Sequence, residues 1–497
     1  MASPAAEPVR AGSPSNDPSS TRSHERLLLA AVASGALLAP LNSTMLAVAL
    51  PDIRSDFTIS HAALGWLISS YLITMAVAQP IAGALGDQLG QTRVLRTALV
   101  VFLLASLAAT IAPSFELLVA LRIGQAAAGA ALIPNGMALI RVRVPSERLG
   151  RVNGLFNAGL AVAAASGPLV GAALLEASSW RLLFLLNVPV VAVALVLHAR
   201  LGSRDENAAG ERPEAERRGD EAPRGRARID WIGGGLFALI LTGITWLLGS
   251  LDGGAGALEL GAIAAATLLA LGAFVQRQLS GRVQMVPWHL FRQRSFAAAN
   301  AYAVLSNLVM YTSLLTIPFF IREVQNGSAS RIGLLLGVMS FLMAALAALS
   351  GRLSDTFGRR LPALAGAAVA LAGGVMLLAG IDGGVSFAYL AVALALVGSG
   401  IGLGTGAAST AAIEVAPRAL AGAASGTNSM MRYVGSIVGA GVLAGLLGSG
   451  GAVPGVGVFQ AVFAVVVGMA LATVVAAAAI HVRVLESPEA PPSPGRR

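Results

Sequence analysis

Long apolar segments, separated by short polar ones, follow one another along almost the whole chain. Each segment is close to the roughly 20 residues that a helix needs to cross the hydrocarbon of a bilayer. Because every backbone amide in lipid needs an internal partner, such segments form helices, whereas the strands of a membrane barrel would be about half as long and would alternate. The sequence therefore predicts an all-α integral membrane protein. The predicted spans are residues 27–50, 62–82, 94–112, 116–140, 152–175, 181–199, 231–250, 257–275, 296–320, 332–350, 361–380, 385–412, 430–449 and 455–480.

Polar stretches divide these spans into blocks. The first 24 residues are rich in Pro, Ser and charge, and the stretch from Arg200 to Asp230 is rich in Arg and acidic residues, so both are expected to be solvated. A cleaved signal peptide is an alternative for the N-terminus, but the apolar run from Leu27 to Leu50 is too long for one and contains Pro40. The predicted organisation is a disordered cytoplasmic tail (1–24), a six-span bundle (25–199), a charged cytoplasmic linker (200–229), two inserted spans that pack outside the core (230–276), a cytoplasmic loop (277–293), a second six-span bundle (294–482) and a disordered cytoplasmic tail (483–497).

The composition agrees with a membrane protein and argues against several soluble classes. Hydrophobic residues make up 56% of the chain, charged residues only 12%, and the mean hydropathy is +0.74, unlike an ordinary soluble domain. The net charge of +9 does not indicate a nucleic-acid binder, because apolar runs separate the basic residues. With no Cys, the chain can form no disulfide, thiolate metal site or cysteine nucleophile.

The basic residues, all of them Arg, are unevenly divided between the two sides of the predicted membrane. If the N-terminus is cytoplasmic, all but five of the 34 fall in cytoplasmic segments. Arg122 lies within a span, and the outer ends and loops carry Arg54, Arg181, Arg322 and Arg331. Since positively charged loops stay in the cytoplasm, both termini are expected there.

The pattern G-x3-D-x2-G occurs twice, at Gly83–Gly90 between spans two and three and at Gly351–Gly358 between spans ten and eleven. These positions are equivalent if the chain contains two six-span units of the same orientation, related by an axis along the membrane normal. The glycines suit tight turns, and each Asp could cap the start of a neighbouring helix. Two ordinary turns are the simpler alternative to a gate. The candidate residues of two cytoplasmic gating loops are Gly83, Asp87, Gly90, Arg93, Gly351, Asp355, Gly358 and Arg359.

Polar and kink-forming residues inside the spans are candidates for a transport pathway. A charge inside a span, such as Arg122, costs roughly 3 kcal/mol, so it should face the bundle interior or a watery cavity, unless it snorkels to the outer interface as a structural residue. Asn42 and Gln125 are candidate cavity-lining residues at similar depth, although interhelical hydrogen bonds alone would also explain them. The fifth span is predicted to kink and pack closely, as a gate or only as a packing seam, at Gly167, Pro168 and Gly171.

A glycine run from Gly398 to Gly406 superficially resembles a dinucleotide-binding loop, but it lies in an apolar span with no preceding strand. Such glycines are typical of a face along which helices approach closely. No P-loop, metal-ligand cluster or nucleophile–base arrangement is visible in the sequence. We therefore expect no cofactor, no metal and no enzymatic activity.

These motifs resemble those of the major facilitator superfamily, specifically its fourteen-span branch of drug:proton antiporters, over nearly everything from Leu27 to Ile480. Gly83–Arg93 resembles the signature loop that the family is understood to use as a cytoplasmic gate. Arg122–Gly129 resembles the fourth-span motif, whose Arg the family associates with proton transfer, and Ser166–Gly171 resembles the antiporter motif of the fifth span. Two further segments resemble signatures of the fourteen-span group: Trp180–Pro189 and Pro287–Arg292.

The resemblance implies a major facilitator fold of two six-helix bundles plus two additional helices. It also implies a secondary-active exporter of small amphipathic compounds, of the drug or antibiotic efflux type, in a bacterial plasma membrane and with protons as coupling ion. The two halves would rock about a midplane cavity, with the Asp87 and Asp355 turns latching the cytoplasmic side. The alternatives are a lipid or specific metabolite exporter on the same fold and a non-transporting membrane sensor.

The first span departs from the pattern of the branch. Where the branch commonly has Asp in an L-D-x-T segment, this chain has Leu41-Asn42-Ser43-Thr44, and Asn cannot titrate. None of the 25 acidic residues lies in the middle of a predicted span. The sequence therefore predicts a neutral or electropositive cavity around Arg122, and a preference for neutral or anionic amphipathic compounds over lipophilic cations.

Overall fold

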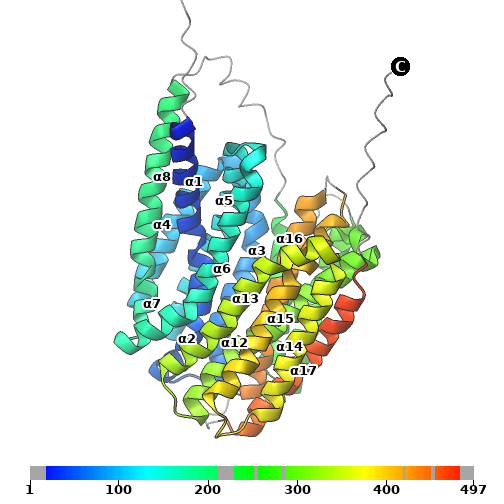
Figure 1. Ribbon diagram of the computed structural model, residues 1–497. Helices are drawn as coiled ribbons and strands as arrows, with labels where there is room; N and C mark the ends of the chain where they lie inside the picture. Colours follow the sequence, from blue (N-terminus) through cyan, green and yellow to red (C-terminus); the bar gives the residue numbers. More distant parts are fainter. Residues whose placement is uncertain are drawn as a thin grey trace, which may run out of the picture.

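The computed structural model describes residues 18–210, 229–250, 256–280, 286–417, 420–448 and 454–481. This part of the chain is built from helices, and it contains 14 candidate spans that are long and apolar enough to cross a membrane (Figure 1). The predicted all-α membrane architecture is therefore confirmed. The tail at 1–17, most of the predicted linker and the tail at 483–497 lie outside the described residues.

The first six spans contain eight helices, because the first and the sixth span are each made of two. α1 begins inside the segment predicted as a tail, and α8 extends into the segment predicted as a linker, so both predicted boundaries shift by several residues. Ser60 and Ser114 start α3 and α5, since their hydroxyls accept hydrogen bonds from Ala63 N and Leu117 N. The elements are α1 (Pro18–Ala36), α2 (Leu38–Phe57), α3 (His61–Leu89), α4 (Gln91–Thr110), α5 (Phe115–Arg143), α6 (Ser146–Ala177), α7 (Arg181–Leu185) and α8 (Asn187–Gly210).

The inserted pair and the last six spans follow. Asp230 starts the first inserted helix by accepting a hydrogen bond from Gly233 N at 2.8 Å, and it also forms an ion pair with Arg277 of the second at 2.7 Å. The elements are α10 (Trp231–Gly249), α11 (Ala257–Leu279), η1 (Trp288–Arg292), α12 (Arg294–Phe319), η2 (Phe320–Val324), α13 (Ala329–Phe357), α14 (Arg360–Gly380), α15 (Phe387–Glu414), α16 (Ala421–Leu447) and α17 (Val456–Ala478).

The helices form two bundles that meet along a seam (Figure 1). We call α1–α8 the first half and α12–α17 the second half. Across the seam α6 packs on α13, α3 on α16 and α2 on α12. The inserted helix α10 covers the α3–α16 contact from outside, whereas α11 is almost entirely exposed, with 6% of its apolar window buried. The inserted pair therefore packs outside the two-bundle core, as predicted.

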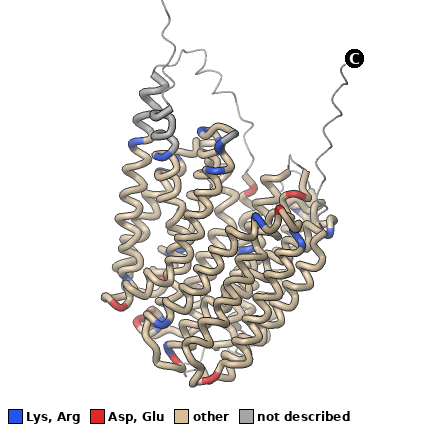
Figure 2. The backbone as a smooth tube through the Cα atoms, viewed as in Figure 1, with Lys and Arg blue, Asp and Glu red and all other residues tan. Residues whose placement is uncertain are grey.

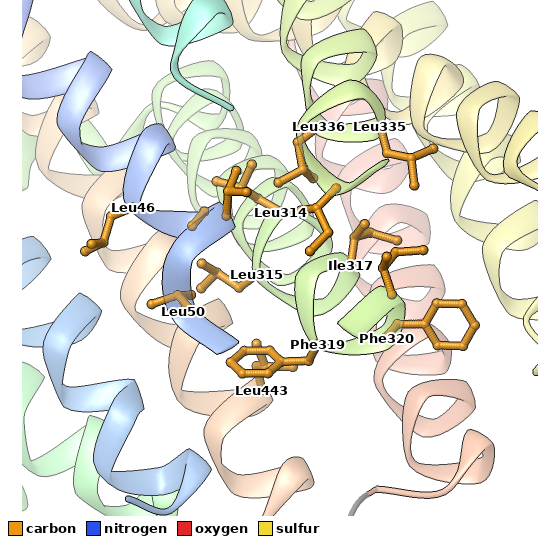
Figure 3. Packing of buried hydrophobic residues seen from close by; sticks show 14 of the residues in the cluster. Leu46, Leu50, Leu314, Leu315, Ile317, Phe319, Phe320, Leu335, Leu336 and Leu443 are labelled. Atoms are coloured by element: carbon orange, nitrogen blue, oxygen red, sulfur yellow. The ribbon is translucent and has the colours of Figure 1, made fainter. Parts of the chain in front are cut away.

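The two ends of the molecule differ in how their apolar cores are arranged. We call the end where α1 begins and α17 ends the terminal end, and the end where α2 and η2 finish the far end. At the far end one buried cluster joins both halves; in Figure 3 Leu50 of α2 lies beside Leu315 of α12, near Leu443 of α16. At the terminal end each half has its own cluster, one drawn from residues 28–201 and the other from residues 290–480. A further buried cluster joins the two halves through the inserted pair, since it contains Met75 of α3, Phe274 of α11 and Met430 of α16.

The glycine run of α15 contacts two helices at once. Gly398 and Gly402 face the carbonyl oxygens of Met339 and Met343 on α13, and Gly400 faces α14. A Cβ added at Gly366 of α14 would lie 2.5 Å from the Gly400 carbonyl oxygen, so neither helix tolerates a side chain there. The run is a packing surface, and it accounts for the close approach of α13, α14 and α15.

Charged residues gather toward the two ends of the helices, with few of them in the long zone between (Figure 2). This is the distribution that a bilayer requires, because a charge held in hydrocarbon is costly unless it faces protein or water. The few charged residues in this zone are therefore expected to face protein or water and not lipid.

Candidate functional site

Arg122 is buried in the first half, with only 1% of its surface exposed. It lies seven residues after the start of α5, about 10 Å from the far end of that helix. Its Nη1 donates to Asn42 Oδ1 on α2 and, at 3.2 Å, to Gln125 Oε1 on its own helix. Its guanidinium lies 4.0 Å from the centroid of the Tyr71 ring on α3. Arg122 thus faces the bundle interior, and the interpretation that it snorkels to the interface is wrong.

The partners of Arg122 extend into a chain of neutral groups. Gln125 Nε2 donates to Ser106 Oγ on α4 at 2.8 Å, and Asn187 Nδ2 on α8 donates to the same oxygen at 3.3 Å. Asn42, Gln125 and Ser106 are all buried. Within the described residues, the partners of this guanidinium are two amide oxygens and a phenol ring, and its Nε has no hydrogen-bond partner. The three predicted residues Asn42, Arg122 and Gln125 are therefore brought together around a cation without a matching carboxylate.

A hydrogen bond ties this network to the second half. Ser43, next to Asn42 on α2, lies 3.0 Å from the Tyr311 hydroxyl on α12. The candidate cavity residues therefore sit directly at the seam, where the two halves would have to part. The sequence placed Asn42 in a span but gave no signal for Tyr311 as its neighbour from the other half.

A second cation, Arg432, lies well within the helix of a candidate span. The predicted thirteenth span began at residue 430, which assigned Arg432 to the cytoplasmic side. In the structure α16 begins at Ala421, so Arg432 lies eleven residues, or about 16 Å, along the helix. Its side chain is exposed, unlike that of Arg122. The helix thus begins nine residues before the predicted span, and the assignment of Arg432 to the cytoplasmic side stays a prediction.

The two G-x3-D-x2-G turns share one backbone feature. Gly90 and Gly358, the last glycines of the two copies, have φ angles of +90° and +75°, a region that favours glycine. Their equivalence supports the internal repeat. The first glycines of the two copies, Gly83 and Gly351, have room for a side chain. A Cβ at Gly83 would lie 3.8 Å from Pro134, and one at Gly351 would meet nothing within 4 Å.

The aspartates of these turns do not cap the following helices. Asp87 and Asp355 lie in the last turns of α3 and α13, and α4 and α14 start without a side-chain cap. The exposed Asp87 instead lies 3.4 Å from Gln91 Nε2. The predicted capping role is therefore wrong, because each Asp precedes the turn rather than the helix start.

In the second copy the turn carries an ion-pair cluster. Arg359 donates to Asp355 at 2.8 Å and to Glu414 of α15 at 2.6 Å. Its hydrogen bonds to Glu414, followed by those to Asp355, raise the pKa of Arg359 above its already high ordinary value. All three residues belong to the second half, so this cluster joins α13 to α15. Arg93, its counterpart in the first copy, is exposed.

The predicted kink residues of the fifth span lie between two neighbouring helices. A Cβ at Gly171 would lie 2.7 Å from the Met45 carbonyl oxygen, and one at Gly167 would lie 3.0 Å from Met45 N, so both glycines face α2 of the same half. Pro168 lies inside the continuous helix α6 and faces α13 of the other half. The packing interpretation is thus supported, and α6 is the helix through which the halves touch.

Ion pairs cross between the halves at the far end. Arg54 of α2 contacts Glu323 of η2 at 2.9 Å, and His61 of α3 contacts the same carboxylate at 3.1 Å. The His61 side chain is 1% exposed and the Glu323 side chain 9%. At the rim, Arg322 contacts Asp52 at 2.7 Å. These ion pairs between the halves therefore lie at the end opposite to the predicted gating loops.

These far-end residues could not be paired from the sequence. Arg54 and Arg322 were recognisable as basic residues of outer segments, but their partners lie more than 260 positions away in the chain. A further contact between the halves also joins residues far apart in the chain: Glu176 at the end of α6 accepts a hydrogen bond from Ser330 N of α13 at 3.0 Å. An open hollow of about 600 Å³ borders this rim and is lined by Asp52, Asp56, Leu175, Glu176, Arg181 and Arg322, among others.

Comparison with known proteins gives a consistent set of relatives. The family model for the Major Facilitator Superfamily matches residues 32–440 and 301–497. The chain is 33% identical over 415 residues to the uncharacterised MFS-type transporter YvkA of Bacillus subtilis, covering 83% of this chain and 89% of that protein. It is 27% identical to a tetracenomycin C resistance and export protein of Streptomyces glaucescens, over 85% of this chain and 76% of that one. It is 29% identical to the multidrug resistance protein Stp of Mycobacterium tuberculosis, over 85% of this chain and 75% of that one.

Solved structures share the fold at low sequence identity. A bacterial homologue of the human lysosomal transporter Spinster aligns with a TM-score of 0.57 and 18% identity, over 92% of this chain and 96% of that one. The nucleoside transporter NupG aligns with a TM-score of 0.62 and 10% identity, over 92% of this chain and 99% of that one.

Proposed function

The chain belongs to the Major Facilitator Superfamily, and we propose that within this family it is a secondary-active exporter of small amphipathic compounds. The observation that carries the proposal is the buried Arg122 network at the seam, with Ser43 and Tyr311 joining the halves beside it. Intramembrane charges held inside a bundle mark substrate or ion pathways. The export direction and the drug-like substrate follow the printed functions of the tetracenomycin C and multidrug resistance relatives.

We assign the terminal end to the cytoplasm of a bacterial cell and the far end to the outside. The support is the Arg distribution, since Arg54, Arg181, Arg322 and Arg331 lie at the far end while the basic turns lie at the other. Both termini are then cytoplasmic, and the protein is a multi-pass protein of the plasma membrane.

With this orientation the structure corresponds to the state that is closed to the outside. The shared apolar cluster and the Arg54–Glu323–His61 contacts hold the outer end together, while toward the cytoplasmic end each half has its own core and the shared apolar contacts run through the inserted pair. Alternating access would require the outer contacts to break while the halves approach each other at the cytoplasmic turns. The α6–α13 and α3–α16 contacts are the surfaces on which this rocking would occur.

We further propose that a proton gradient drives export, as in the drug:proton antiporters that the motifs resemble. Asn42 cannot carry the proton. A candidate pair is instead His61 and Glu323, which face each other across the two halves at the outer end, where opening would expose both to external protons.

The proposal is tested with purified protein in liposomes under an imposed proton gradient, with uptake of a panel of amphipathic compounds as the readout. We expect gradient-driven transport by the wild type and loss of transport in Arg122→Ala, with the variant still folded and inserted. The matched control is Arg151→Ala, an exposed Arg on α6 outside the site. Transport by Arg122→Ala at the wild-type rate would leave Arg122 a structural residue only, and no transport of any compound by the wild type would contradict the exporter function.

A further inference from the structure

We propose that the inserted pair, α10 and α11, moves with the second half as one body and slides over α3 of the first half during transport. The inference rests on the proposed export function, because it names the contacts of the inserted pair that change when the two halves rock. It gives a role to the two helices that lie outside the two-bundle core.

The two inserted helices are held to each other at two levels. At the terminal end Arg277 of α11 forms an ion pair at 2.7 Å with Asp230, the residue that starts α10. Further along the helices, the rings of Phe237 and Phe274 stack with their centroids 5.8 Å apart. Within a bilayer, side-chain packing and polar contacts of this kind are what hold neighbouring helices together. The pair therefore forms one unit.

The segment that leads into α12, which includes η1, fastens this unit to the second half. On one side Val286 is buried in the cluster that contains the inserted pair, and its N–H donates to Gln278 Oε1 of α11 at 3.4 Å. On the other side Leu290 is buried in the terminal-end cluster of the second half. The Phe291 ring meets the Phe296 ring of α12 edge-on, with centroids 5.0 Å apart. The segment thus packs on both bodies and leaves little freedom between them.

α10 also interlocks with α16 of the second half near the far end. A Cβ at Gly441 of α16 would lie 3.1 Å from the Leu248 Cβ of α10 and 3.0 Å from its Cδ1. The Leu248 side chain therefore fills the space that the missing side chain of Gly441 leaves, and the two helices approach closely, as small residues allow in membranes. Displacing α10 along α16 would move the Leu248 side chain out of this space.

The contacts of α10 with α3 of the first half are made by the ends of side chains. The rings of Trp246 and Trp66 lie with their centroids 6.0 Å apart. A Cβ at Gly234 of α10 would lie 3.3 Å from Ile81 Cδ1 and 3.4 Å from Val77 Cγ1. Packed helices can slide past each other by small shear movements when such side-chain ends change rotamer. The α3–α10 contact is therefore the one that can slide.

Opening of the far end makes such a slide necessary. There α3 and α16 touch directly, since a Cβ at Gly65 would lie 2.8 Å from Ala444 Cβ. When these two helices part, α10 cannot keep its contacts to both of them unchanged. Because α10 stays with α16, it remains over the widening gap and covers this side of the seam against lipid while α3 moves beneath it.

The test links α10 to one half or to the other. The chain has no Cys, so two introduced cysteines form a single defined link. In Leu248→Cys/Gly441→Cys the two Cβ atoms would lie 3.1 Å apart, near the roughly 3.5–4.5 Å of a disulfide, and the bond joins α10 to α16. In Trp66→Cys/Trp246→Cys a short bifunctional methanethiosulfonate joins α10 to α3. Proton-gradient-driven uptake into liposomes is measured before linking, after linking and after reduction.

The α10–α16 link should leave uptake within about twofold of the unlinked protein, because both helices belong to one body. The α10–α3 link should lower uptake by about tenfold or more, because it stops the slide, and reduction should restore it. Loss of uptake with the α10–α16 link, or normal uptake with a complete α10–α3 link, would overturn the proposal.

A third pair separates this proposal from the exporter function. Gly65→Cys/Ala444→Cys joins α3 to α16 directly and should abolish uptake reversibly, whichever half the inserted pair follows. Uptake that continues through this link would contradict alternating access itself, and no uptake by the unaltered chain would contradict the exporter function. The two α10 links concern the inserted pair alone.

Spin-label distances test the same proposal without transport. Labels at the exposed Gly256 of the inserted pair, Gly383 of the second half and Ser55 of the first half are compared with and without Glu323→Gln, which favours opening of the far end. The Gly256–Gly383 distance should stay the same while the Gly256–Ser55 distance changes. A Gly256–Gly383 distance that changes while the Gly256–Ser55 distance stays constant would show that the pair follows the first half.

Discussion

The two ends of the helix bundle are joined in different ways. At the far end one apolar cluster runs through both halves, and Glu323 accepts contacts from Arg54 and His61 of the opposite half. At the terminal end each half also has an apolar cluster of its own, the halves share apolar contacts through the inserted pair, and the Arg359 cluster joins helices of the second half. At the far end the two bodies therefore share one core and ion pairs, whereas at the terminal end each body has a core of its own and the shared apolar contacts run through the inserted pair.

This difference indicates what has to change during transport. Opening the far end requires the separation of a shared apolar surface and of partly buried ion pairs, which is costly, so the described state should be the stable one in the absence of other forces. Closing the terminal end requires no repacking of either core. A ligand or proton therefore needs to act mainly on the far-end contacts to shift the equilibrium between the two states.

The largest effect is expected at the close helix contact near the far end. A Cβ at Gly333 of α13 would lie 2.8 Å from the Pro168 carbonyl oxygen on α6, so Gly333→Leu forces the halves apart. Transport, measured by liposome uptake, should be lost in Gly333→Leu and only partly reduced in Gly333→Ala. A Cβ at the exposed Gly154, on α6 toward the terminal end, would meet nothing within 4 Å, so Gly154→Leu should transport normally. Equal losses in Gly154→Leu and Gly333→Leu would remove the contrast between the two ends.

A smaller effect is expected when the buried carboxylate of the far end is neutralised. The Glu323 side chain is only 9% exposed. Glu323→Gln removes its charge and so weakens its contacts to Arg54 and His61. The cost to the closed far end should be about 1–3 kcal/mol, which corresponds to a roughly tenfold to hundredfold shift toward the state open at that end. This shift is measured as the increase in the reactivity of a cysteine introduced at the far end toward a water-soluble thiol reagent. Asp382→Asn, which removes a far-end carboxylate bonded within its own turn, is the matched control.

The smallest effect is expected at the exposed rim pair. Asp52 and Arg322 have side chains that are 25% and 43% exposed, and exposed pairs contribute about 0–1 kcal/mol. Asp52→Asn should therefore change the same cysteine accessibility by less than about fivefold, and the change should diminish further at high salt. An effect of Asp52→Asn larger than that of Glu323→Gln would show that burial does not decide which contacts hold the far end.

Much of the fold was predictable, because the bilayer imposes strong rules on the sequence. The length of the apolar segments predicted the spans. The two G-x3-D-x2-G copies predicted the two halves, and their last glycines, Gly90 and Gly358, both have a positive φ. Helix ends were less predictable. α16 begins at Ala421, and its first turns, Ala421 to Gly426, consist of small residues and Ser with weak hydropathy that still form a helix, so the predicted span started too late in the chain.

The candidate site was predictable only in part. Arg122 was detectable because a charge in a span is rare, and its neighbours Asn42 and Gln125 were found by depth. Contacts between the halves could not be found, because Ser43 and Tyr311, or His61 and Glu323, are more than 260 residues apart and carry no local signal of pairing. The aspartates of the turns were assigned a capping role because their spacing resembles a cap, although they lie inside the preceding helices.

Spin-label distances measured at both ends of the molecule test alternating access most directly. The chain has no Cys, so labels can be placed at the exposed Gly150 and Gly422 for the terminal end, and at Ser55 and Gly383 for the far end. The Gly150–Gly422 distance is measured between the two halves at the terminal end, and the Ser55–Gly383 distance is measured between them at the far end. Alternating access predicts that Glu323→Gln, relative to the unaltered background, lengthens the far-end distance and shortens the terminal-end distance in the same molecules. Unchanged distances, or a lengthening at both ends, would contradict it.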